Sequence, residues 1–154
     1  MPPLFSDVGD SMPASDPRPP VPKPLPVPSP ESAIFWQAAR NHRMLLPHCN
    51  KCGKFWFPPS CLCPHCLSDD IGWREVSGRG RVHSFVIVHR VYHPAFISEV
   101  PYVVAVIELD EGPRLLSNVV NVKPARVHCG MRVAVTYDDV SAEISLPKFS
   151  HDDV

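Results

Sequence analysis

Two Cys-x-x-Cys pairs lie close together in this sequence, and ten residues separate them. Each pair can form a tight turn whose two thiolates converge on one ion, and two such turns complete a tetrahedral shell. A short segment with almost no core can be ordered in this way, because structural zinc contributes folding free energy of order 10 kcal/mol in small zinc peptides. The spacing therefore predicts a compact metal ribbon over residues 47–70 instead of a long finger.

The two pairs predict one structural zinc ion per chain. Four protein thiolates leave no open position for water or substrate, so this ion would not be catalytic. A redox-active iron site uses the same ligands and is the alternative occupant. Cys61 lies beside the second pair and could compete for the metal, but the two-residue spacer of a knuckle favours Cys63-Pro64-His65-Cys66. The assigned ligands are Cys49, Cys52, Cys63 and Cys66.

Proline dominates the N-terminal segment, since eleven of the 20 prolines fall in residues 1–30. Fixed φ angles and missing N–H donors exclude a helix or a central strand there. We expect residues 1–29 to form a disordered arm or an arm that lies on a partner subunit, with an SH3-type ligand as the alternative. No apolar run approaches the roughly 18–20 residues of a membrane helix, and no secretory signal is recognisable. A soluble, cytoplasmic protein is the expectation.

The pattern becomes helical at Ser29-Pro30-Glu31, where a capping serine, a proline and an acid suit the start of a helix. A helix is predicted from Pro30 to His42, within a unit of residues 30–46. Its apolar stripe either packs on its own domain or docks on another chain. For docking, the candidate residues are Ile34, Phe35, Trp36 and Ala38.

From residue 71 onward the sequence is typical of β-structure. In the long second strand, the side chains at even positions from Val82 to Val88 should share one face of the strand. The side chains at odd positions from His83 to His89 should share the other face. We predict a mainly β protein in which the helix and the zinc ribbon precede a five- or six-stranded OB-type barrel over residues 71–147, followed by an acidic tail, 148–154. The predicted strands are Gly72–Ser77, Gly80–Tyr92, Tyr102–Leu109, Arg114–Val120, Met131–Tyr137 and Glu143–Leu146.

The net charge of −1 divides into −1 over residues 1–30, +4 over residues 31–137 and −4 over residues 138–154. A charge of +4 is too weak to indicate nucleic acid, but it would suit a ligand with a few phosphates. Arg79 and Arg81 are the candidate phosphate contacts. Their flanking glycines, Gly78 and Gly80, lack the third glycine of a dinucleotide loop and predict a β-bulge instead. No motif of a hydrolase, a zinc protease or a P-loop enzyme is present in the sequence.

Short motifs follow one another in a characteristic order over residues 30–146. In this order they resemble a family of small OB-fold, acyl-CoA-associated proteins with an N-terminal rubredoxin-like zinc ribbon, known as domain of unknown function thirty-five. The Pro-rich leader and Cys61 depart from the family pattern. The motifs are Phe35-Trp36, Cys49-Asn50-Lys51-Cys52-Gly53, Phe57-Pro58-Pro59, Cys63-Pro64-His65-Cys66, Trp73, Ser77-Gly78-Arg79-Gly80-Arg81-Val82, Pro101-Tyr102, Glu108-Leu109-Asp110-Glu111-Gly112 and Gly130-Met131-Arg132-Val133.

The resemblance implies an auxiliary subunit that has no catalytic residue of its own and works beside a thiolase-like, aldolase-like or hydratase-like enzyme. It also implies zinc on the four cysteines and a CoA thioester as a ligand that such proteins hold or pass. A carbon–carbon bond-forming or bond-cleaving partner is favoured over a hydratase by analogy. A single-stranded nucleic-acid-binding OB module is the other function to be weighed, because zinc ribbons and OB barrels serve that purpose too.

Overall fold

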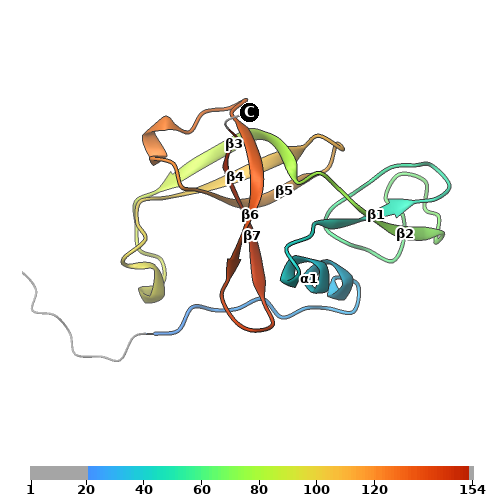
Figure 1. The fold of residues 1–154 in the computed structure, drawn as a ribbon, viewed down its shortest axis with the longest axis horizontal. Helices are drawn as coiled ribbons and strands as arrows, with labels where there is room; N and C mark the ends of the chain where they lie inside the picture. The colour runs from blue at the N-terminus through green and yellow to red at the C-terminus, as the bar shows by residue number, and fades with distance from the viewer. Residues whose placement is uncertain (1–20, 153–154) are drawn as a thin grey trace, which may run out of the picture.

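The computed structural model describes residues 21–152, so most of the predicted N-terminal arm lies outside the described residues. Residues 21–29 have no regular secondary structure and cross the tip of the hairpin formed by β6 (Arg132–Asp139) and β7 (Ser145–His151) in the view of Figure 1. They rest on their own barrel, where Lys23 forms an ion pair with Glu99 and lies 5.6 Å from the centre of the Phe96 ring. Together with the barrel, this segment encloses a cavity of about 680 Å³.

The single α-helix of the described chain, α1 (Ala33–Arg40), is shorter than predicted at both ends. Ser32, not Ser29, is the N-cap residue, because Ser29 and Ser32 bond to each other in a preceding turn in which the Ser29 backbone N–H donates to Ser32 Oγ at 2.9 Å. The helix ends where His42 takes a left-handed φ of 55°. This helix is neither long nor apolar enough to cross a membrane, and the described residues contain no other candidate span.

A two-stranded antiparallel sheet carries the ribbon. Strand β1 (Leu45–Cys49) pairs with β2 (Ile71–Glu75), so the chain enters and leaves the cysteine segment through neighbouring strands. β1 was not predicted, because Pro47 reads as the end of a segment; this sheet tolerates proline since β1 has an open edge. The expectation that β2 belongs to the barrel is wrong, because its hydrogen-bonded neighbour is β1.

The barrel is closed, with five strands in the order β3-β4-β5-β7-β6, which confirms the predicted OB-type architecture. Its third and fourth predicted strands match the observed bounds, and the others shift by up to several residues. The last strand extends through residues expected in an acidic tail, because Phe149 is completely buried and Lys148 pairs with Asp138 at 2.6 Å. The strands are β3 (Arg79–Val88), β4 (Tyr102–Leu109), β5 (Arg114–Val120), β6 (Arg132–Asp139) and β7 (Ser145–His151).

A β-bulge divides β3 and changes which of its side chains face inward. Val82 lies opposite Ile107, whereas Ser84 lies opposite Val106, so His83 is the extra residue. The predicted alternation of faces therefore holds only up to Val82; beyond it the odd residues turn inward, because an extra residue reverses the two-residue period. The bulge follows the glycines and is not formed by them. Gly80 instead allows close contact, since a Cβ there would lie 2.3 Å from the Glu108 carbonyl oxygen.

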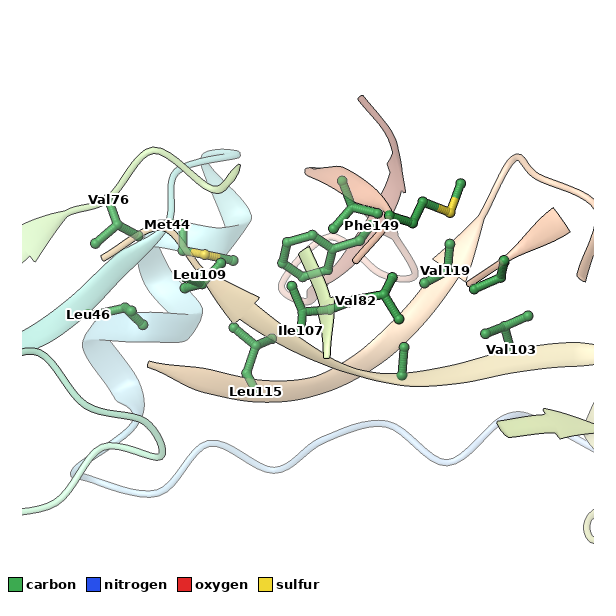
Figure 2. Close-up of a cluster of buried hydrophobic side chains, with 14 of the residues drawn as sticks. Met44, Leu46, Val76, Val82, Val103, Ile107, Leu109, Leu115, Val119 and Phe149 are labelled. Atoms are coloured by element: carbon green, nitrogen blue, oxygen red, sulfur yellow. The ribbon is translucent and has the colours of Figure 1, made fainter. Parts of the chain in front are cut away.

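One hydrophobic core joins the barrel, the helix and the ribbon sheet. Phe149 lies among barrel side chains such as Ile107 and Leu109, and Met44 and Leu46 approach the same cluster from the ribbon side (Figure 2). Phe35 of α1 is 4% exposed and belongs to this cluster. The ribbon is therefore held against the barrel by shared apolar packing, and its orientation depends on α1.

An exposed ion pair near the barrel rim gives a testable pH dependence. Arg132 donates two 2.8 Å hydrogen bonds to Asp110, and these bonds hold the pKa of Asp110 below its ordinary value. A depressed carboxyl pKa contributes stability above the unfolded pKa of about 3.9, and this stability is lost as the pH falls through the folded pKa. We expect Asp110→Asn to cost less than about 1 kcal/mol at pH 6, since the pair is exposed, and progressively less as the pH falls below about 3.9 toward the folded pKa. Urea unfolding of both proteins at each pH measures this; a cost that does not change with pH would contradict it.

Candidate metal centre

Two knuckles of matching geometry present the four cysteines. In the first, the Gly53 N–H donates to the Cys49 carbonyl oxygen at 2.8 Å; in the second, the Leu67 N–H donates to the Cys63 carbonyl oxygen at 2.8 Å. The residue that ends each knuckle has a left-handed backbone, with φ of 72° at Gly53 and 59° at Leu67. Each turn thus closes in the same way and directs its two sulphurs to one point.

The four sulphurs of Cys49, Cys52, Cys63 and Cys66 all lie within 4.8 Å of one another. Cys49 Sγ is 3.5 Å from Cys66 Sγ, and Cys52 Sγ is 3.6 Å from Cys63 Sγ. A tetrahedral ion with Zn–S bonds of about 2.3 Å requires sulphurs about 3.8 Å apart, so the cluster has the size that zinc needs. Cys61 is exposed and outside the cluster.

The thiols influence one another strongly, as ligands of one metal would. The backbone N–H of Cys52, 3.4 Å from Cys49 Sγ, lowers the pKa of Cys49 to about 7. A backbone hydrogen bond from Ser68 lowers the pKa of Cys66, but burial and the three neighbouring thiols outweigh it and raise this pKa to about 12. Four thiols this close cannot all ionise without a cation, and a divalent metal supplies the missing charge.

The interior of the ribbon is small and packed around the sulphurs. Cys49 and Cys63 are completely buried and pack with Trp56, whose indole N–H donates to Ser60 Oγ at 3.0 Å. His48, a neighbour of the first pair, stacks edge-on against Phe55 with ring centres 4.8 Å apart. With four thiolates the shell of a bound ion is complete, so the chemistry of the cluster is that of a closed structural site.

The predicted docking residues do not share one environment. Phe35 and Ala38 are buried, so this part of the helix packs on its own domain. Ile34 is 42% exposed, and Trp36 is partly buried at the edge of the core. Of the four predicted docking residues, only Ile34 and Trp36 are accessible at the surface.

Sequence reasoning missed an apolar groove beside α1, with a volume of about 270 Å³. Trp36 and Phe57 line one side, and Leu116 of β5 lines another with 69% of its surface exposed. The signal was available: Leu115 and Leu116 are consecutive apolar residues in a strand, so one of them must point out of the barrel.

The predicted phosphate contacts, Arg79 and Arg81, project from the outer face of β3 and are exposed. Each has a carboxylate nearby, with Arg79 Nε 3.5 Å from Asp152 and Arg81 Nε 3.8 Å from Glu108. Glu108 binds Arg114 more closely, at 2.7 Å. The structure therefore places both arginines on a surface of mixed charge, where their distances to the carboxylates are longer than that of Arg114 to Glu108.

Two family descriptions match the chain in succession. Residues 36–72 match the rubredoxin-like zinc ribbon domain of ChsH2, and residues 73–138 match the C-terminal OB-fold domain of ChsH2. The junction falls inside β2, where the observed ribbon sheet leads into the barrel.

Proteins of two kinds are similar in sequence to this chain. A DUF35 domain-containing scaffold protein of Methanocaldococcus jannaschii is 37% identical over 104 residues, which cover 66% of this chain and 73% of that protein. A probable enoyl-CoA hydratase alpha subunit of Thermomonospora curvata is 38% identical over 127 residues, covering 82% of this chain but only 39% of that protein. The chain thus spans about two fifths of the hydratase subunit it matches.

A solved structure described as the Ltp2-ChsH2(DUF35) aldolase contains a similar fold. It matches with a TM-score of 0.75 and 37% identity, over 82% of this chain and 98% of that chain. A ribbon of the same kind, followed by the same barrel, makes up almost all of the matched chain. The protein therefore belongs to the ChsH2 family of DUF35 proteins, which join a rubredoxin-like zinc ribbon to an OB-fold barrel.

Proposed function

We propose that this chain is a non-catalytic, zinc-containing accessory subunit that docks on an acyl-CoA-processing enzyme of the thiolase-like or aldolase-like class. The observation that carries the proposal is the match to 98% of a chain in a solved aldolase structure. The description of other relatives as scaffold proteins supports the same role. In this proposal Cys49, Cys52, Cys63 and Cys66 hold one zinc ion that supports the ribbon.

One serine, one aspartate and one histidine lie together in the described chain, but without the arrangement of a hydrolytic triad. The closest approach to a hydrolytic triad is Ser145, Asp139 and His42, but their order is wrong. His42 Nε2 lies 2.9 Å from Asp139 Oδ1, and Ser145 Oγ donates to the same oxygen. A Ser-His-Asp triad requires histidine between the serine and the acid, whereas here aspartate occupies the middle.

We also propose that the barrel helps to hold the partner's CoA thioester, with Arg79 and Arg81 as contacts for its phosphates. Their carboxylate partners lie at 3.5 and 3.8 Å, beyond good hydrogen-bond distance, so a phosphate could replace them at little cost. Zinc has no part in this binding, because its shell is closed by four sulphurs.

A hydratase-like partner is the second candidate, since two relatives are described as hydratase alpha subunits. The chain covers only 39% and 34% of those proteins, so their activity belongs to a larger molecule. A nucleic-acid module is less well supported, because the exposed Tyr92 is near a single arginine, Arg90, at 5.9 Å, and Phe96 faces Tyr102 and Lys23 instead of a basic groove.

Co-expression tests the proposal. We expect the full chain to form a stable complex with a thiolase-like or aldolase-like subunit encoded beside it, with higher turnover than that of the subunit alone. Size-exclusion chromatography with light scattering measures the complex, and thioester formation or cleavage measures activity. A hydratase-like subunit, expressed with the chain in the same way, is the control. Separate migration with both subunits, or turnover by this chain alone, would refute the proposal.

A further inference from the structure

A cationic pocket of about 450 Å³ lies in the barrel domain. It is bounded by the end of β5, the 3₁₀ turn η2 (Pro124–Arg126) and the end of β7. This volume is within the range of about 300–1,000 Å³ typical of small-molecule sites. The residues that line it are Asn121, Val122, Lys123, Arg126, Ser150 and His151.

The turn η2 places two cations on the same side. Lys123 and Arg126 are three residues apart, and the Arg126 N–H donates to the Lys123 carbonyl oxygen at 2.8 Å. Lys123 is the N-cap residue of this turn and Arg126 is its last residue, and both line the same pocket. Pro124 at the first position fixes the backbone. Two like charges held on one face repel each other, and an anion between them removes that cost.

The lining of the pocket contains no carboxylate, in contrast to the surroundings of four other barrel arginines. Arg79, Arg81, Arg114 and Arg132 each face an acidic side chain. Asp152, the acid nearest in sequence to the pocket, is directed to Arg79 at 3.5 Å. No ion pair is formed by Lys123 or Arg126 with any described carboxylate, so both charges are available to a ligand.

We propose that this pocket binds a phosphate group, either a phosphate monoester or a diphosphate. Lys123 and Arg126 supply the charge, since a guanidinium and an ammonium are the usual partners of phosphate oxygens. The Asn121 amide and the Ser150 hydroxyl add neutral donors. This site is separate from Arg79 and Arg81, and its occupancy does not depend on the docking role proposed above.

Calorimetry on the full, zinc-loaded chain without a partner tests the site. The probes are inorganic phosphate, pyrophosphate, CoA and 3′-dephospho-CoA, at low ionic strength so that surface charges are not screened. We expect the double variant Lys123→Ala/Arg126→Ala to bind pyrophosphate and CoA at least about tenfold more weakly than the wild type. Loss of binding on removal of the 3′-phosphate would identify a monoester as the ligand, and equal binding of both CoA forms would identify the diphosphate.

A matched variant separates a site from general attraction. Arg40→Ala/Arg74→Ala removes the same charge from exposed side chains in α1 and β2, outside the pocket. It should bind within about twofold of the wild type, and both variants should melt like it, because exposed substitutions change stability little. Equal weakening in both variants, equal affinity of the wild type and the pocket variant, or no binding of any probe at millimolar concentration would overturn the proposal.

Discussion

Replacing Cys63 with serine is expected to remove zinc from the protein and to unfold the ribbon. Cys63 is completely buried, and its sulphur lies 3.6 Å from that of Cys52, so no other side chain can take its place in the shell. Structural zinc supplies about 10–16 kcal/mol of apparent binding free energy in zinc-finger peptides, and here the buried residues packed directly around the sulphurs form only a small cluster with Trp56. Metal content measured by mass spectrometry should fall from one zinc ion per chain to almost none.

Cys61→Ser is the matched control, because it removes a thiol two residues away that is exposed and outside the cluster. This variant should retain its zinc and its melting temperature. Loss of zinc in Cys61→Ser with retention in Cys63→Ser would show that the ligand set is wrong. Iron in place of zinc in the wild type would show that the ribbon carries the redox-active alternative.

The ribbon was predictable because covalent spacing alone determines it. Two cysteines separated by two residues can converge on one ion whatever the rest of the chain does, and the sulphurs meet as expected. The barrel class was predictable for a similar reason, since turn residues such as Asp110-Glu111-Gly112-Pro113 set the ends of β4 and β5 at the observed positions.

The features of the fold that the sequence did not predict depend on contacts between segments that lie far apart in the chain. β1 forms because β2, which begins 22 residues after Cys49, pairs with it. The proline within β1 argues against a strand when the sequence is considered alone. β7 extends to His151 because the barrel needs a strand between β5 and β6, whatever the local charge. The bulge at His83 is invisible because it depends on the register of β4. The pocket at Lys123 and Arg126 was missed since the ends of two strands and a turn create it.

Helix α1 has one residue packed in the core and an exposed residue next to it, and substitution of each tests a different role of the helix. Phe35 is 4% exposed and its ring lies 5.3 Å from those of Trp36 and Phe57, so it joins helix, ribbon and barrel. We expect Phe35→Ala to destabilise the chain by about 3–5 kcal/mol, as is usual for a large aromatic removed from a core. Chemical denaturation of the zinc-loaded chain measures this loss.

Ile34→Ala serves as the comparison, because it truncates the next residue of the same helix where 42% of the side chain is exposed. It should cost no more than about 0.5 kcal/mol in the isolated chain. If the exposed edge formed by Ile34, Trp36 and the groove at Leu116 is the docking surface, Ile34→Ala and Leu116→Ala will weaken the complex with the partner enzyme without lowering the melting temperature of this chain. Unchanged partner affinity in both variants would leave α1 with a purely structural role, as a brace that Phe35 fixes between ribbon and barrel.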